Sequence, residues 1–201
     1  MNFKFTLSTC VLLLMITFAL SDAAMAGAPT DQVRATVDQV LAILKDPSLK
    51  SDAAKKDRRA RLSKAILPRF DFEEMAKRSL GAEWRGRTAA EQKEFIRLLT
   101  DLLKDSYVTS IESYHGDKVV YGRESQDGRF AGVDTAVVAQ KGEQFAISYR
   151  VHLVDGNWKI YDVVIENISI VNNFRSQFRR FLGRSSFEEL LRAMRDKISQ
   201  P

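Results

Sequence analysis

The sequence predicts an α+β domain in which helices pack over a twisted four-stranded antiparallel meander sheet. Apolar residues recur with a helical period in the first and last parts of the chain, and they alternate with period two between about residues 118 and 165. Short turn sequences separate the alternating segments, and connections this short join antiparallel neighbours. Because the sequence has no internal repeat and no long linker, we expect a single domain.

The first 26 residues have the pattern of a cleaved export signal. Lys4 precedes an apolar stretch over 7–20, and Ala24-Met25-Ala26 places small residues at alternate positions before a cleavage point. The stretch is too short to span a membrane comfortably, and Cys10 lies inside it, whereas a lipoprotein needs its cysteine at the end. We therefore expect a signal peptide at 1–26 and a soluble domain at 27–201 in the periplasm of a bacterium.

The composition of the expected mature domain limits how it is stabilised. Its net charge remains +5, because Lys4 and Asp22 leave together, and it contains no cysteine. Core packing must therefore hold the fold without disulfides or cysteine-ligated metals. Positive side chains concentrate between Lys50 and Arg69. Since nucleic acid is not an expected partner in the periplasm, this run is either a solvated helix face or a patch for anionic head groups or an acidic partner.

The helical segments carry start and stop signals. We expect helices over about 30–45, 51–67, 72–80, 88–114, 169–182 and 186–198. Thr30 is the predicted cap of the first helix. The predicted capping boxes are Asp71 with Glu74, Thr88 with Glu91, and Ser185 with Glu188. The helix over 88–114 has the widest apolar stripe and needs a large partner surface.

Four strands are expected near 118–124, 133–139, 145–154 and 158–165. If Asp155-Gly156 is a two-residue turn, Val151 faces Ile160, Tyr149 faces Asp162 and Ile147 faces Val164. The opposite face then carries Tyr161, Val163 and Ile165, so this end of the sheet is apolar on both sides. A core shared with the helices explains one such face, and either the long helix or a ligand covers the other.

Catalytic and metal-binding patterns are missing from the sequence. Its two histidines, His115 and His152, have no metal-binding spacing, and His152 lies among apolar strand residues. Asp162 and Glu166 are separated by about 13 Å along a strand, which is too far for a catalytic pair. We find no phosphate loop or nucleophile elbow either. The sequence therefore predicts a protein that is not an enzyme and has no metal or cofactor.

The segment from Gly156 to Phe178, GNWKIYDVVIENISIVNNFRSQF, resembles the most recognisable part of the MlaC family. The run over 70–76, Leu80-Gly81 with Trp84, and Phe95 with Leu102-Leu103 and Tyr107 are similar to the helical half of that family. Its members are the periplasmic phospholipid-binding components of a lipid-asymmetry ABC transport system. The family usually has glycine at the position of Asn167 and tyrosine at that of Phe174.

This resemblance implies a cavity between the sheet and the helices that takes the acyl chains of a phospholipid. The implied lipid-binding residues are Leu99, Leu102, Leu103, Tyr107, Val137, Ile147, Tyr149, Val151, Trp158, Ile160, Val164, Phe174 and Phe178. The implied partners are an inner-membrane ABC transporter with its membrane-anchored ring protein and an outer-membrane lipoprotein with a porin. We expect a monomer. The alternatives are a periplasmic binder of a hopanoid or other sterol-like lipid, and an enzyme on a similar scaffold.

Overall fold

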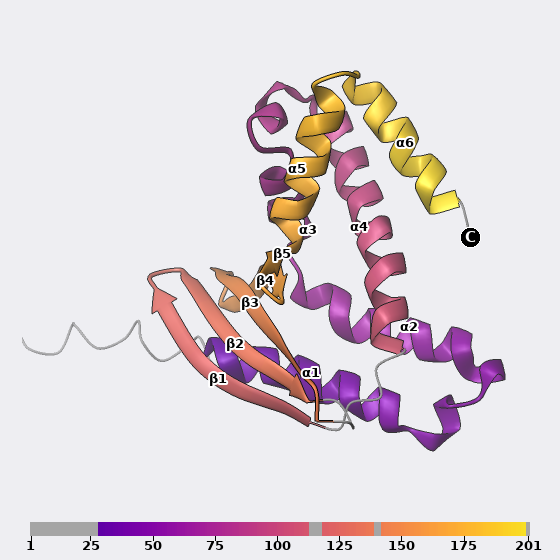
Figure 1. The fold of residues 1–201 in the computed structure, drawn as a ribbon, viewed down its shortest axis with the longest axis vertical. Coiled ribbons are helices and arrows are strands. Elements are labelled where there is room, and N and C mark those ends of the chain that lie inside the picture. The colour runs from indigo at the N-terminus through magenta and orange to yellow at the C-terminus, as the bar shows by residue number, and fades with distance from the viewer. Residues whose placement is uncertain (1–27, 113–117, 139–141, 200–201) are drawn as a thin grey trace, which may run out of the picture.

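The computed structural model describes residues 28–112, 118–138 and 142–199. Within these residues the chain forms the predicted α+β fold, with an antiparallel sheet of strand order β1-β2-β3-β4-β5 and helices packed around it (Figure 1). The expected signal peptide at 1–26, the expected helix end near residue 114 and His115 lie outside the described residues.

The sheet contains the four expected strands and one more. Its strands are β1 (Lys118–Asp127), β2 (Phe130–Val138), β3 (Gln144–Val154), β4 (Asn157–Ile165) and β5 (Ile168–Ser169). The prediction of four strands is therefore wrong. Two residues are too few to leave a period-two pattern, so the sequence gives no strand signal at β5.

The connection between β4 and β5 is a tight turn at Glu166-Asn167. Both residues have positive φ, 47° and 64°, and Ile165 pairs with Ile168 across the turn. Asparagine is one of the few residues other than glycine that adopts this conformation readily. The turn therefore forms with asparagine at position 167.

The six expected helices are present in the described residues. They are α1 (Pro29–Lys45), α2 (Lys55–Ile66), α3 (Phe72–Leu80), α4 (Ala89–Glu112), α5 (Ile170–Leu182) and α6 (Phe187–Ser199). Single turns of 3₁₀ helix flank α2, at Pro47–Leu49, Asp52–Ala54 and Leu67–Arg69, and a longer 3₁₀ helix of 6 residues, Gly81–Gly86, follows α3.

Two of the four predicted helix starts, those at Asp71 and Thr88, are confirmed. The Asp71 carboxylate accepts a hydrogen bond from the Glu74 amide at 2.9 Å, and the hydroxyl of Thr88 and the carboxylate of Glu91 bond each other's backbone amides. The prediction that Thr30 caps α1 is wrong, because its amide and hydroxyl both donate to the Glu124 carboxylate of β1.

The capping box before α6 lies one residue later than predicted. Ser186 and Glu189 exchange the bonds that we expected between Ser185 and Glu188. Both pairs fit the spacing rule, so the sequence pattern alone did not distinguish them.

The helices form two groups (Figure 1). α1 lies along one face of the sheet and α2 packs against α1, while α3, α5, the first half of α4 and α6 form a cluster beyond β4 and β5. In that cluster Phe95 is fully buried, and its ring lies 5.3 Å from that of Phe178 and 6.0 Å from that of Phe187. The second half of α4 leaves the cluster and reaches α2, so this helix joins the two groups.

The Asp155-Gly156 turn has two residues, as predicted. Both residues have positive φ, 48° and 75°, and Val151 pairs with Ile160. Matched positive φ values suit a tight hairpin because they follow the twist of the strands.

Beyond this turn the predicted register is wrong. A bulge at Tyr161 shifts the pairing by one residue, so that Tyr149 faces Val163 and Ile147 faces Ile165. A shift of one residue exchanges the two faces of a strand. Val163 and Ile165 therefore share the face of Tyr149, whereas we predicted Val164 there.

The packing between α1 and β1 leaves one buried polar atom without a partner. The Arg34 guanidinium lies 4.5 Å from the centre of the Tyr121 ring, and the Tyr121 hydroxyl is buried with no hydrogen-bond partner among the described residues. The pKa of Tyr121 is raised to about 12, mainly by burial and secondarily by the charge of Asp38, while the charge of Arg34 acts in the opposite direction.

We expect Tyr121→Phe to leave the free energy of unfolding unchanged at pH 7 or to raise it by up to about 1 kcal/mol, because an unpaired buried hydroxyl is removed. Between pH 10 and 12 the unfolded tyrosine ionises before the folded one, so the wild type should lose stability that the variant keeps. Urea unfolding at pH 7, 10 and 11 measures both effects. A variant that is less stable than wild type at pH 7 would contradict this account. The same dependence of the free energy of unfolding on pH in both proteins would also contradict it.

Candidate ligand-binding pocket

An apolar pocket of about 330 Å³ lies between the sheet and the helices. One wall comes from α1, from the end of α2 and the segment after it, and from the start of α3: Val33, Thr36, Val37, Val40, Leu41, Ile66, Leu67, Phe70, Phe72 and Met75. A second comes from the second half of α4: Leu103, Lys104, Tyr107, Val108, Ser110 and Ile111. The sheet and the start of α5 provide the third: Val119, Val137, Ile147, Tyr149, Ile160, Val163, Ile165 and Ile170.

The first wall is attached to the sheet through Arg69. Its guanidinium donates to the Gln32 side chain at 2.8 Å, to the Thr36 hydroxyl at 3.1 Å and to the Trp158 carbonyl at 3.1 Å. The Gln32 side chain also accepts from the Trp158 amide at 2.9 Å. Burial lowers the pKa of Arg69, and these partners satisfy the partly buried donors. This last arginine of the predicted basic run thus holds α1 against β4.

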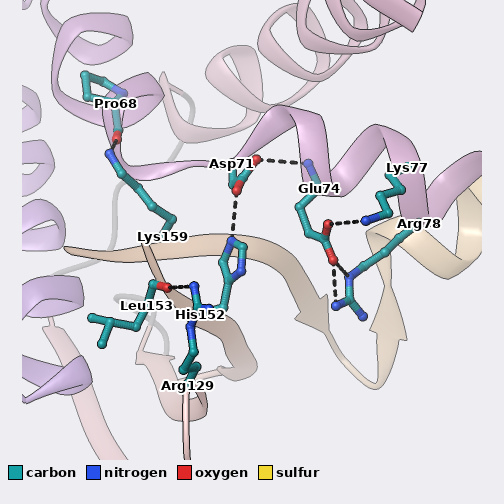
Figure 2. A network of polar contacts seen from close by, with 9 residues as sticks. All are labelled: Pro68, Asp71, Glu74, Lys77, Arg78, Arg129, His152, Leu153 and Lys159. Atoms are coloured by element: carbon teal, nitrogen blue, oxygen red, sulfur yellow. Dashed lines mark hydrogen bonds and ion pairs between the residues drawn. The ribbon is translucent and has the colours of Figure 1, made fainter. Parts of the chain in front are cut away.

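Asp71 attaches the start of α3 to β4 and to β3, and Figure 2 shows its contact with His152 of β3. Its amide donates to the Ile160 carbonyl at 2.8 Å, and its carboxylate lies 2.9 Å from the His152 ring nitrogen. On either side of it, Phe70 and Phe72 stack with ring centres 5.7 Å apart and line the pocket. His152 therefore contacts a helix cap, and it is not among the residues that line the pocket.

Asp162 connects β4 to α5 from outside the pocket. Its carboxylate is almost fully buried, and it accepts from the Ser169 hydroxyl at 2.6 Å, the Val171 amide at 3.1 Å and Arg150 at 3.0 Å. These bonds hold the first turn of α5, whose amides favour a negative charge. Burial and the nearby charge of Asp162 raise the pKa of Tyr107, which lines the pocket, so its hydroxyl stays neutral at physiological pH.

The basic run over 50–69 has two structural parts. Arg58 and Arg59 both pair with the Glu112 carboxylate at the end of α4, and the Glu112 side chain is only 7% exposed. Arg58 also donates to the Leu49 carbonyl. The exposed cations of the run are Lys50, Lys55, Lys56, Arg61 and Lys64. A docking patch, if this run provides one, would consist of those five residues.

The structure brings six of the thirteen predicted lipid-binding residues together around the pocket: Leu103, Tyr107, Val137, Ile147, Tyr149 and Ile160. The other seven lie outside its lining. Leu99, Leu102, Val151, Trp158 and Phe178 are buried in the core, Phe174 stacks on Phe178 at 5.5 Å, and Val164 lies on the opposite sheet face.

Several lining residues were not predicted, for two different reasons. The spacing of Val33, Val37 and Val40 already marked an apolar face of α1 in the sequence, and we did not assign that face to the pocket. Val163 and Ile165 reach the pocket only because of the bulge at Tyr161, for which the alternating pattern contains no signal.

Neither a cluster of metal ligands nor a membrane-crossing helix occurs in the described part of the chain. No three histidine, cysteine, aspartate or glutamate side chains among them come together as a metal site. None of their helices combines the length and hydrophobicity needed to cross a bilayer.

The fold and the pocket place this chain among helices-over-sheet proteins with an apolar pocket between the two layers. The family model of the MlaC protein matches residues 34–196, and the chain therefore belongs to the MlaC family. The match spans the elements that line the pocket.

Individual relatives are distant in sequence. The intermembrane phospholipid transport system binding protein MlaC of Haemophilus influenzae is 21% identical over 141 residues, which is 68% of this chain and 66% of that protein, or just under two thirds of its length. The toluene tolerance protein ttg2D of Pseudomonas putida is 24% identical over 185 residues, 87% of this chain and 82% of that protein.

A solved structure shares the fold. The phospholipid-binding protein of Ralstonia solanacearum, determined in complex with a phospholipid, superimposes with a TM-score of 0.77 at 24% identity. The superposition covers 87% of this chain and 98% of the Ralstonia chain.

We expect Asp162→Ala to lower the free energy of unfolding by about 2–4 kcal/mol, because buried donors lose their acceptor and Arg150 loses its ion-pair partner. Asp134→Ala is the matched control, since Asp134 is exposed and accepts one bond, from the Ser148 hydroxyl. Asp134→Ala should lower the free energy of unfolding by less than about 1 kcal/mol. Urea titration of both variants tests the prediction, and equal losses would show that Asp162 does not anchor α5.

Proposed function

We propose that this protein is a periplasmic phospholipid carrier that holds acyl chains in the pocket between the sheet and the helices. The observation that carries the proposal is the lining of that pocket in a member of the MlaC family, since almost all of the lining side chains are apolar. The phospholipid complex of the structural relative from Ralstonia supports it. The relatives' names offer no support for the hopanoid alternative.

Such a carrier does not need an unusually high affinity for its lipid. Each methylene removed from water contributes roughly 0.8 kcal/mol, so a pocket that covers most of an acyl chain competes with a bilayer that offers the same gain. An apolar pocket that is partly enclosed by protein meets this requirement. Release to a membrane then depends on contacts with docking partners.

The proposed setting follows the family and the N-terminal pattern. Residues 1–26 act as the signal peptide, and residues 27–201 form a single, monomeric lipid-binding domain. Its partners are an inner-membrane ABC transporter with a membrane-anchored ring protein and an outer-membrane lipoprotein with a porin. The name of the Haemophilus relative, which refers to intermembrane phospholipid transport, supports this assignment. Carriage of an intact lipid breaks no bond, so the function proposed here is not an enzymatic one.

Native mass spectrometry tests the proposal on the full chain, expressed with its leader and extracted from the periplasm of a bacterial host. We expect a polypeptide that begins at Gly27 and carries one or more phospholipids. Mild collisional activation should release masses that match the phospholipids of the host. A protein without lipid, or with only a sterol-like ligand, would contradict the proposed function, and a retained leader would contradict the proposed export.

The two faces of β4 provide a matched pair of variants. Ile165 lines the pocket and its neighbour Val164 points to the opposite face, and both are half-buried. Ile165→Arg should lower the amount of bound phospholipid about tenfold or more, because a charged group in an apolar pocket opposes acyl chains. Val164→Arg should keep its lipid. Lipid extraction with a thermal melt of each variant measures this, and loss of lipid only in Val164→Arg would show that the faces are exchanged.

A further inference from the structure

The exposed edge of the pocket lies along one helix. Of the residues that the structure describes around the pocket, only Lys104 and Ser110 are exposed, and both belong to the second half of α4. They are six residues apart, about 9 Å along the helix axis. The remaining lining residues are buried or half-buried. A ligand whose chains fill the pocket therefore leaves its polar end beside this stretch of α4, because burying a phosphate without a partner costs several kcal/mol.

Lys104 is the one charged residue among the described lining residues. No hydrogen bond or ion pair joins it to another described residue, whereas its neighbour Asp101 is paired with Arg97 at 3.2 Å. The Ser110 hydroxyl already donates to the Ser106 carbonyl at 3.0 Å. The exposed edge of the pocket therefore presents one unpaired ammonium group.

Tyr107 extends this polar edge inward. It lies one helical turn after Lys104, on the same side of α4, and it also lines the pocket. A tyrosine hydroxyl is protonated at neutral pH, and burial raises the pKa of Tyr107 further, so the phenol is able to donate a hydrogen bond. Lys104 and Tyr107 therefore provide an ammonium donor and a phenol donor one helical turn apart, and a phosphate oxygen accepts from groups of both kinds.

We propose that Lys104 receives the phosphate of the bound lipid and gives the protein a preference for phospholipids with a net negative head group. The inference rests on the proposed carrier function. A zwitterionic head group carries its own ammonium beside the phosphate, which reduces the attraction to Lys104. An anionic head group such as phosphatidylglycerol keeps the full attraction. Exposed charge pairs contribute about 0.2–1 kcal/mol, so the preference should be about 1.4- to fivefold.

The test loads the mature protein from vesicles that contain phosphatidylglycerol and phosphatidylethanolamine in equal amounts, and it measures the ratio of the two lipids in the reisolated protein. Wild type should be enriched in phosphatidylglycerol relative to the vesicles. Lys104→Gln should lose this enrichment, and Lys104→Arg should retain it. Lys93→Gln is the matched control, because Lys93 is an exposed residue of the same helix outside the pocket lining. It should behave as wild type.

The outcomes separate this inference from the proposed function. Wild type that takes up no phospholipid would overturn both. Loaded protein with the same lipid ratio in wild type and Lys104→Gln would overturn only the role of Lys104, as would equal loss of enrichment in Lys93→Gln. Circular dichroism melts should coincide for all four proteins, since both lysines are exposed.

Discussion

The bulge at Tyr161 is the constraint on which both the pocket and the attachment of the C-terminal helices depend. If the side chains of β4 alternated between the two sheet faces without interruption, Ile160, Asp162 and Val164 would share one face. The Asp162 carboxylate would then point into the apolar pocket. The extra residue in β4 instead turns Asp162 outward and brings Val163 and Ile165 inward. Asp162 then finds its partners at the start of α5. One backbone irregularity thus separates the charged and apolar side chains of this strand.

Strand β4 also organises the other side of the pocket. The Trp158 backbone bonds to Arg69 and Gln32, and the Ile160 carbonyl accepts from the Asp71 amide. These polar bonds join segments that are far apart in the sequence, and they hold the elements that carry Val33, Phe70 and the other lining residues. Contacts of this kind keep the walls in place without filling the space between them. An apolar pocket is stable in water only if such a frame prevents its collapse, because close packing is otherwise favoured.

Local signals predicted much of the fold. The capping pairs at Asp71 and Thr88 and the tight turn at Asp155-Gly156 were identified from short patterns whose physics is local. Features that depend on tertiary partners were missed. Thr30 had the right residue type for a cap but meets Glu124, which lies far away in sequence, and β5 exists only because β4 is beside it. Family resemblance indicated a lipid cavity, yet only the three-dimensional register decided which side chains surround it.

A photoreactive phospholipid offers the most direct measurement of the central claim, that acyl chains occupy the pocket between the sheet and the helices. The lipid would carry a diazirine at the end of one acyl chain and would be exchanged into the mature protein before irradiation and peptide mapping. If the acyl chains occupy this pocket, we expect adducts on pocket residues of α1, of the second half of α4, and of β3 and β4. Adducts confined to the opposite sheet face or to the exposed surfaces of α5 and α6 would contradict it.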